Sequence, residues 1–309
     1  MSWKVLVTGA GGLVASAIQS EGKKYPEYEF LFSGRRDHDL TKQEDVERLF
    51  VEFKPDYVIH TAARVGGIGK NLNSPAQQYY DNILMNTHII HTAYLNNVEK
   101  LIAFSSVCAF PADSKILKEE NLHDGPPFPA HGSYAYSKRM VDVQIAAYRK
   151  QYGTQYCSVI PGNIFGEYDN FNLEDGHVVP SLIHKGYLAV EKNNPLEVWG
   201  DGTPTREFLY AKDVARACIE LLKKDKLPQK IIVSGQEEIT IRSLVKKILH
   251  IYGHEKVKWL TDKPNGQMKR PSSKKVLHEI LPHLEFTPIE EALEHTIRWF
   301  QKNYRDARK

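Results

Sequence analysis

The chain alternates between short apolar runs and longer stretches with helical spacing, and this alternation constrains its fold more than any other feature. Apolar runs separated by helices are typical of βαβ units, whose parallel strands are buried on both faces of a sheet. Right-handed crossovers then place helices on both faces, in a doubly wound arrangement. We therefore predict an α/β protein with a parallel sheet. The predicted strands are Lys4–Thr8, Glu29–Ser33, Asp56–Thr61, Lys100–Ser105, Gln155–Ile160 and Lys230–Ser234.

A glycine-rich loop follows the first predicted strand and opens the first predicted helix. Gly9, Gly12 and Ala15 occupy the three small-residue positions of a GxxGxxG pattern, with Leu13 and Val14 in the first helical turn. A tight turn at Gly9 and a bare backbone at Gly12 let a pyrophosphate approach the N-terminus of the helix. The small Ala15 allows close packing of helix on strand. Because the loop lies between a strand and a helix, it predicts a Rossmann domain that binds a dinucleotide.

Two arginines follow the second predicted strand, where an NAD-dependent enzyme commonly carries an acidic residue. Arg35 and Arg36 supply charge and paired donors that suit a 2′-phosphate, so we predict NADP(H) as the cofactor. The alternative is that both are solvated surface arginines. Asp39 is a candidate hydrogen-bond acceptor for the adenine amine. The small residues Ala62 and Ala63 follow the third strand and leave room for the ribose and the pyrophosphate of the cofactor. The alternative is that their small size serves close packing of the strand against a helix.

The regular alternation ends after Pro161, and the chain from there predicts a second unit. Residues 166–205 are rich in Asn, Asp, Gly and Pro, with one helix near Pro180–Leu188. Further helices are predicted at 207–225, at 240–250 with Thr240 as N-cap, and at about 288–303. The predicted NADP-binding Rossmann domain comprises 1–165 and 206–238, and a smaller mixed α/β substrate lobe comprises 166–205 and 239–309.

Composition excludes several other classes of protein. The formal net charge of +3 is too small to indicate nucleic-acid binding, and no basic patch is interleaved with aromatic residues. Cys108, Cys157 and Cys218 form no CxxC pair, which predicts neither a disulfide framework nor a metal site and favours a reducing compartment. We find no leader sequence and no apolar run near the roughly 18–20 residues that cross a bilayer. A cytoplasmic location is the expectation.

A candidate catalytic set lies after the fourth strand and in the helix that follows. Tyr134 and Lys138 have i,i+4 spacing and so share one helical face, where the ammonium is expected to lower the pKa of the phenol. The phenol could then exchange a proton with a carbinol oxygen. Ser106, at the carboxyl end of its strand, is placed to hydrogen-bond a substrate carbonyl, although a capping role is the alternative. Together with the glycine loop, these residues predict an enzyme.

At this point the chain resembles the extended short-chain dehydrogenases and, among them, the GDP-L-fucose synthase family. The resemblance covers nearly the whole chain and is most specific in five strings: Val65–Ile68, Ser106–Pro111, Asp169–Asn172, Asp175–Pro180 and Trp199–Phe208. Four positions depart from common family patterns: Ala15 for glycine, Lys185 for arginine, Tyr168 for histidine and Ser273 for aspartate. The last departure puts one substrate contact in doubt.

The resemblance implies roles for individual residues. Ser106, Tyr134 and Lys138 match the reductase triad of the family, while Cys108 and His177 match its epimerase pair. Without the family, Cys108 would be interpreted as a small buried hydrophobic residue. The implied substrate-binding residues are Ser106, Asn163, Lys185, Trp199 and Arg206. The implied cofactor-binding residues are Gly9, Gly12, Leu13, Val14, Arg35, Arg36, Asp39, Leu40, Ala62, Ala63, Ser105, Tyr134, Lys138, Pro161, Asn163, Ile164 and His177.

The chemistry of the implied reaction is consistent with these residue types. A 4-ketone acidifies the protons on C3 and C5 of a GDP-4-keto-6-deoxy-mannose, and a thiolate and an imidazole could remove and return them. Ser106 and Tyr134 would stabilise the enolate oxygen, and NADPH would then reduce C4. The resemblance also implies a homodimer formed by a four-helix bundle, with a helix around 76–97 and the helix from Tyr134 to Tyr148 as candidates.

Three alternatives remain open at the level of sequence. The nearest is a related nucleotide-sugar 4-epimerase or 4-reductase, including an enzyme for a GDP-4-keto-heptose. A 4,6-dehydratase is disfavoured because Val107 and Cys108 stand where it would need an Asp-Glu pair. The third is a non-catalytic NADP(H)-binding scaffold, which the intact Tyr134 and Lys138 argue against.

Overall fold

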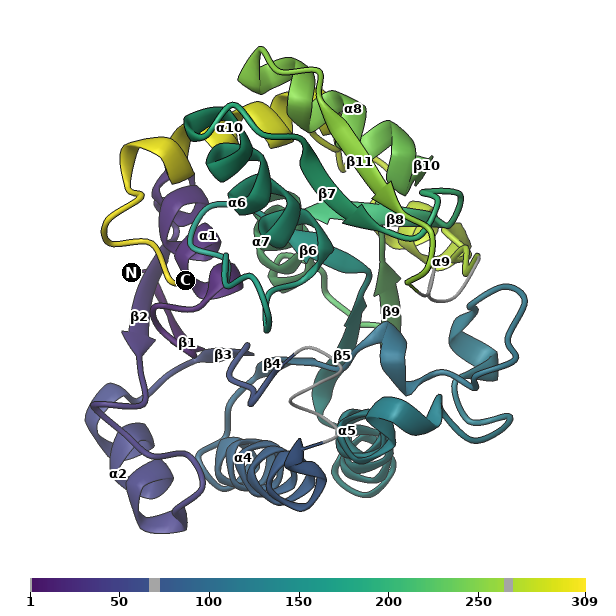
Figure 1. Ribbon diagram of the computed structural model, residues 1–309. Coiled ribbons are helices and arrows are strands. Elements are labelled where there is room, and N and C mark those ends of the chain that lie inside the picture. The colour runs from purple at the N-terminus through teal and green to yellow at the C-terminus, as the bar shows by residue number, and fades with distance from the viewer. Residues whose placement is uncertain (1, 67–72, 264–268) are drawn as a thin grey trace.

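A computed structural model of the 309-residue chain describes residues 2–66, 73–263 and 269–309. Of the family strings named above, Gly67 and Ile68 lie outside the described residues. The chain builds a parallel sheet covered by helices, with a second lobe of helices and small sheets against it (Figure 1).

All six predicted strands are present in one parallel sheet, in the order β2-β1-β3-β4-β5-β9. Leu6 points to one face while its neighbours Val5 and Val7 point to the other, and none of the three is exposed, so the sheet is buried on both sides. The prediction of a doubly wound α/β fold is confirmed. The strand bounds are β1 (Trp3–Thr8), β2 (Tyr28–Ser33), β3 (Tyr57–His60), β4 (Lys100–Phe104), β5 (Gln155–Pro161) and β9 (Lys230–Val233).

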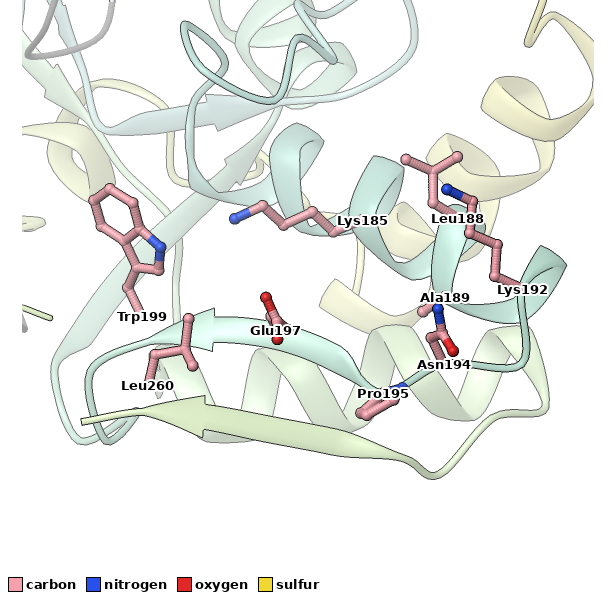
Figure 2. Close-up of a pocket in the computed structure, with 9 residues that line it drawn as sticks. All are labelled: Lys185, Leu188, Ala189, Lys192, Asn194, Pro195, Glu197, Trp199 and Leu260. Carbon is pink, nitrogen blue, oxygen red and sulfur yellow. The ribbon is translucent and has the colours of Figure 1, made fainter. Parts of the chain in front are cut away.

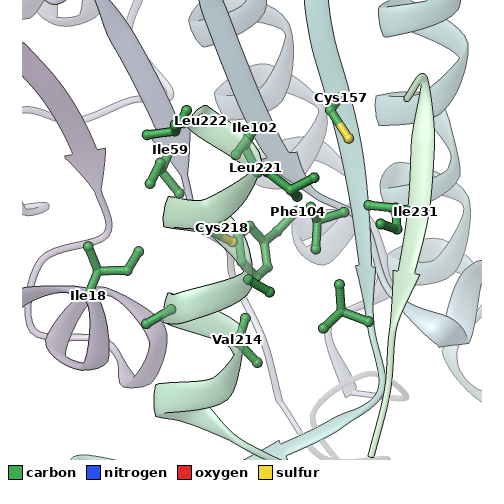
Figure 3. Close-up of a cluster of buried hydrophobic side chains, with 14 of the residues drawn as sticks. Ile18, Ile59, Ile102, Phe104, Cys157, Val214, Cys218, Leu221, Leu222 and Ile231 are labelled. Atoms are coloured by element: carbon green, nitrogen blue, oxygen red, sulfur yellow. The ribbon is translucent and has the colours of Figure 1, made fainter. Parts of the chain in front are cut away.

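Two groups of helices cover the two faces of this sheet (Figure 1). On one face, α1 (Leu13–Glu21) packs against α7 (Ala211–Leu222), and their apolar residues join those of the strands in one cluster (Figure 3). Cys157 and Cys218 are fully buried in this cluster. The other face carries α2 (Gln43–Phe53), α4 (Pro75–Leu95) and α5 (Gly132–Tyr152).

The second lobe contains α6 (Val178–Glu191), α8 (Ile241–Tyr252) and α10 (Ile289–Lys302), which share a hydrophobic cluster. Thr240 caps α8 as predicted, since its hydroxyl accepts a hydrogen bond from the Ser243 amide at 3.0 Å. Two small sheets, which were not predicted, complete the lobe. Their strands are β6 (Asn163–Phe165), β8 (Thr205–Tyr210) and β10 (Glu238–Thr240) in one sheet, and β7 (Leu196–Trp199) and β11 (Val257–Leu260) in the other.

Two segments connect the lobes near the carboxyl ends of the strands. The excursion between β4 and α5 contains the short 3-10 helices η2 (Val107–Ala109), η3 (Glu119–Asn121) and η4 (Pro129–His131). It is joined to the segment before α9 (Lys275–Ile280) by a β-bridge, in which Leu117 donates to the Pro271 carbonyl and accepts from the Ser273 amide at 2.7 Å.

The helix α9 packs against β9, and Leu277 and Leu281 belong to the cluster of the large sheet. A segment of 239–309, which the sequence assigned to the substrate lobe, thus shares its core with the first domain. The domain bounds given above remain a prediction. No helix in the described part of the chain is both long and apolar enough to span a bilayer.

Candidate active site

The glycine loop has the backbone geometry that a dinucleotide site requires. Gly9 has a φ of +82°, and a Cβ there would lie 2.9 Å from the Thr61 hydroxyl and 3.0 Å from the Ala62 backbone. Gly12 is the N-cap of α1 and provides no side chain to bond the amides of the first turn. Those amides, which include Leu13 and Val14, have no partner within their own helix and are available to a phosphate. The loop thus fits the predicted nicotinamide dinucleotide.

The residues after β2 combine exposed cations with an ordered turn. Arg35 and Arg36 are exposed, as a contact to a 2′-phosphate requires. One carboxylate oxygen of Asp39 accepts bonds from the Thr41 hydroxyl and amide, at 2.8 and 3.1 Å. These bonds, the hydroxyl bond foremost, hold the pKa of Asp39 below its usual range, so Asp39 is ionised at neutral pH. Leu40 is buried beside it.

A buried hydrogen-bond chain fixes the end of β3 against β1. Nδ1 of His60 lies 2.7 Å from the Thr8 hydroxyl, and its Nε2 lies 3.1 Å from the Asn86 side-chain oxygen. Burial, and secondarily the charge of Lys138, lowers the pKa of His60 to about 3, so the imidazole is neutral. Ala62 and Ala63 follow β3 directly and remain partly accessible to solvent beside the glycine loop.

Ser105 and Ser106, at the end of β4, have different tasks. The Ser105 hydroxyl is buried and donates to the Lys138 carbonyl at 2.9 Å, which ties α5 to the strand. Ser106 is the N-cap of η2, and its hydroxyl accepts from the Cys108 amide at 3.2 Å. Ser106 therefore does act as a helix cap, which was the alternative role. Its side chain is nevertheless partly exposed and also hydrogen-bonds the Tyr134 phenol.

Tyr134 and Lys138 lie on the first turns of α5, as the i,i+4 spacing requires. Lys138 is buried, its Nζ donates to the Phe104 carbonyl at 2.8 Å, and burial lowers its pKa to about 8. The pKa of Tyr134 is raised, by burial first and by the negative charge of Cys108 second, while the bond to Ser106 opposes the rise. The expectation that Lys138 lowers the phenol pKa is therefore wrong for this structure, because burial dominates.

Cys108 lies in η2 against His131, a residue that the sequence did not single out. The thiol and the imidazole form a side-chain hydrogen bond, and Arg270 lies close enough to act on both. Although burial opposes the change, the hydrogen bond and charge of His131 bring the pKa of Cys108 below its usual value. The only sequence signal for His131 was its position, three residues before Tyr134.

His177 is the N-cap of α6 and its side chain is exposed. The desolvating surroundings of the ring and the charge of Arg308 lower its pKa, so it is neutral near pH 7. His177 thus interacts with Arg308, whereas Ser106, Cys108 and Tyr134 interact with one another. The structure brings these three together and places Lys138 directly behind them.

The segment after β5 lies between the two lobes. Pro161 is buried in β5, Asn163 begins β6, and Ile164 packs against the cluster of the large sheet. The side-chain amide of Asn163 donates to the Glu207 carbonyl of β8 at 3.1 Å. This bond links the predicted cofactor segment to the strand that carries Arg206.

Two guanidinium groups, Arg206 and Arg270, lie close enough for the charge of Arg270 to act on Arg206. Burial, followed by the charge of Arg270, lowers the pKa of Arg206. The Nε atom of Arg270 is buried without a hydrogen-bond partner in the described parts of the chain, and its Nη2 donates to the Pro111 carbonyl at 3.0 Å. Two neighbouring cations, one of which has a buried Nε without a partner in the described residues, fit a diphosphate. Arg270 was not predicted, because it stands in a polar loop without periodicity.

Lys185 and Trp199 line a pocket of about 360 Å³ on the second lobe (Figure 2). Lys185 extends from α6 toward Trp199, and its Nζ lies 6.0 Å from the centre of the indole ring. Trp199 is 59% exposed, which leaves its face open to a stacked ring. Ser273, which stands where some family members have an aspartate that contacts substrate, uses its backbone amide in the bridge to Leu117. In the described ranges, no three His, Cys, Asp or Glu residues are grouped as a metal site would require.

Comparison with known proteins places the chain among nucleotide-sugar enzymes. Residues 5–235 match the NAD dependent epimerase/dehydratase family. The chain is 38% identical to a GDP-L-fucose synthase of Dictyostelium discoideum, with 99% of this chain and 97% of the relative covered. It is 37% identical to a probable GDP-L-fucose synthase of Drosophila melanogaster, with 99% of each covered. A crystal structure of a GDP-L-fucose synthetase from Naegleria fowleri bound to NADP superposes with a TM-score of 0.92, at 35% identity, covering 99% of this chain and 95% of that one.

Proposed function

The chain belongs to the NAD dependent epimerase/dehydratase family, and from this premise we propose that it acts as a GDP-L-fucose synthase. It epimerises GDP-4-keto-6-deoxy-D-mannose at C3 and C5 and then reduces C4 with NADPH to give GDP-L-fucose. The observation that carries the proposal is the mutual contact of Ser106, Cys108 and Tyr134 at the carboxyl end of β4, beside a dinucleotide loop.

The epimerisation half needs a base and a stabilised enolate. The Cys108 thiolate removes a proton next to the ketone, and the lowered pKa of Cys108 increases the share of this basic form. Ser106 and Tyr134 donate hydrogen bonds to the oxygen that gains charge, in a partly water-excluded site where such bonds are strong. His177, with its neutral imidazole, is the proposed partner that exchanges a proton with the opposite face of the sugar.

The reduction half reuses the same hydroxyl pair. NADPH, when bound at the glycine loop, supplies the hydride that reaches C4. Tyr134 donates the proton to the C4 oxygen, and its raised pKa means that it carries this proton at neutral pH. Lys138 is buried and anchors the start of α5 through the Phe104 carbonyl, and it would hold the ribose of the bound cofactor.

The nucleotide of the substrate is proposed to lie along the second lobe. Arg206 and Arg270 bind the diphosphate, and the guanine stacks on Trp199 with Lys185 at its edge. The bound diphosphate would relieve the repulsion between the two guanidinium groups.

A homodimer is proposed through the exposed faces of α4 and α5. Tyr94 and Tyr152 stack at 4.0 Å between ring centres, and Tyr148 contacts both rings. Leu95 and Val143 are exposed on the same two helices, which is unusual for faces that stay in water. A cytoplasmic location accords with three unpaired cysteines.

One incubation tests the proposal directly. The purified protein, GDP-4-keto-6-deoxy-D-mannose and NADPH should yield GDP-L-fucose, identified by NMR, together with loss of the NADPH absorbance. A product reduced at C4 but unchanged at C3 and C5 would favour a simple 4-reductase. Turnover with a GDP-4-keto-heptose in place of the 6-deoxy sugar would favour the alternative substrate.

A further inference from the structure

We propose that His131 is a positioning residue for Cys108: the imidazolium of His131 holds the Cys108 sulfur as a thiolate and returns it to that form after each proton abstraction. The part of this inference that concerns turnover rests on the proposed function. The thiolate–imidazolium pair itself does not, and it can be tested without any substrate.

The backbone around both residues is fixed by contacts that meet at the start of α5. Arg139 is buried and donates from Nε and Nη2 to the Ala109 carbonyl, at 2.9 and 2.5 Å, which holds η2 against α5. Ser106 accepts from the Cys108 amide and fixes the first turn of η2. His131 ends η4 and is the residue that precedes α5. Two short helices that are separate in sequence therefore present the thiol and the imidazole to each other.

The imidazole has few competing partners. The Phe128 ring packs against it, with 5.4 Å between ring centres. The buried Nε2 of His131 has no hydrogen-bond partner within the described residues, so the bond with the Cys108 thiol is the side-chain hydrogen bond that acts on this ring.

The groups that face the pair come from the segment before α9, from α5 and from the cap of η2. Arg270, from the segment before α9, lowers the pKa of both groups, and Ser106 lowers that of Cys108 by hydrogen bonding. From α5, the Tyr134 phenol faces the sulfur as a neutral group, and Lys138 lies behind it. The hydrogen bond with Cys108 raises the pKa of His131 despite its burial, and the matching bond lowers that of Cys108. The combined effect favours transfer of the thiol proton to the imidazole.

The pair gives the epimerase step a way to reset. When the thiolate takes a proton from carbon, an S–H bond forms and the electron pair of the C–H bond enters the enolate. The enolate carbon is then protonated from the opposite face. His131 releases its own proton to solvent and takes the proton of the thiol, which restores the thiolate and the imidazolium. One proton leaves to solvent for each one that the opposite face receives, so the balance closes.

Alkylation of the free enzyme by iodoacetamide tests the pair, because the thiolate is the reactive form. Cys157 and Cys218 are fully buried, and burial raises the pKa of both, to about 12 for Cys157. The rate of modification, followed by intact mass against pH, therefore reports on Cys108. Cys108→Ser should remove the fast modification altogether.

Two variants of His131 separate charge from shape. His131→Asn keeps a hydrogen-bonding side chain without a charge, and the midpoint of its alkylation profile should move to higher pH, with a rate at pH 7 roughly 10-fold lower. His131→Arg keeps a positive charge but no titrating proton, so its midpoint should stay low. If His131→Asn reacts with the same pH profile as the parent enzyme, the pair does not exist.

Exchange of C3 and C5 protons in deuterated water then tests the resetting role. His131→Arg should retain alkylation at low pH yet exchange these protons several-fold more slowly than the parent, since arginine cannot accept the thiol proton. Parental exchange in His131→Arg would overturn the resetting role. An enzyme that shows the alkylation shift but no turnover of the GDP-sugar would leave the thiolate pair in place and instead contradict the proposed function. Thermal unfolding of each variant confirms that it is folded.

Discussion

The two ends of the candidate active site are built in different ways. The cofactor end takes most of its residues from neighbouring stretches of chain, with Gly9 and Gly12 in one turn and Arg35 directly after the next strand. The substrate end gathers residues that are far apart in sequence, such as Cys108, Glu207 and Arg270. The first end depends on backbone geometry and the second on contacts between lobes.

This difference predicts how each end responds to change. A substitution at the cofactor end acts by steric conflict or strain, so its effect on folding should accompany its effect on binding. A substitution at the substrate end can release one segment and leave the sheet intact. Stability and sugar binding should then separate.

The largest effect is expected at the junction of the two ends. Tyr134→Phe removes the proton donor and one enolate hydrogen bond, so the rate of hydride transfer should fall by roughly 10²–10⁴-fold. Affinity for NADPH should be nearly unchanged, because α5 keeps its packing. Stopped-flow absorbance and NADPH titration measure the two quantities. Tyr136→Phe, on an exposed neighbour of the same helix, is the matched control, and equal rates for the two variants would refute the role of Tyr134.

A pair of glycines tests the steric basis of the cofactor end. Gly9 and Gly11 both have φ near +80°, so alanine strains either backbone by about 1–2 kcal/mol. Only at Gly9 does a Cβ meet the Thr61 and Ala62 atoms within 3.0 Å, whereas at Gly11 it meets nothing within 4 Å. Gly9→Ala should therefore lose about 1–3 kcal/mol more in urea unfolding, and should weaken NADPH binding more. Equal losses would mean that backbone strain alone matters.

The buried His60 should make the first domain sensitive to acid. Its pKa is about 3 in the folded protein and near 6.5 when exposed, so below pH 6.5 the unfolded chain binds a proton that the folded chain does not. The contribution of His60 to the free energy of unfolding therefore has its full value above pH 6.5, and about 2 kcal/mol of it should be lost between pH 6.5 and pH 5. Urea unfolding at pH 7 and pH 5 measures the difference. His60→Gln should flatten this dependence, and an unchanged slope would assign the acid sensitivity to other groups.

The smallest of the four effects is expected at the substrate end. Glu207 is buried and accepts from the hydroxyl and amide of Ser272, at 2.7 and 3.1 Å, which holds the segment that carries Arg270. Glu207→Gln should weaken this tether by about 1 kcal/mol and raise KM for the GDP-sugar several-fold, with NADPH affinity unchanged. Glu290→Gln, which removes the ion pair between exposed Glu290 of α10 and Lys247 of α8, is the control. A parallel loss of NADPH affinity would contradict the separation of the two ends.

The sequence was informative where a residue follows a regular element. Ser106 could be placed because it follows a strand closely, and Tyr134 because helical spacing pairs it with Lys138. His131 and Arg270 could not, since each lies in a segment without periodicity and acquires its role only from tertiary contacts. The helix predicted at 207–225 begins only at Ala211, because the residues before it form β8. The small strands β6, β7, β10 and β11 were missed for a related reason. They have only three or four residues, too few for an alternating pattern to stand out.

The bridge between Leu117 and Ser272 has a consequence for engineered hybrids of this enzyme with its relatives. In a hybrid whose crossover point lies between β9 and residue 239, Leu117 would come from one parent and Ser272 from the other. The donor and recipient loops would then have to agree in length and backbone direction at both Leu117 and Pro271, or the guanidinium of residue 270 would be displaced from the proposed substrate site. Grafts that transfer 107–131 and 269–275 as one unit should keep substrate turnover, whereas grafts that divide them should yield folded but inactive chimeras.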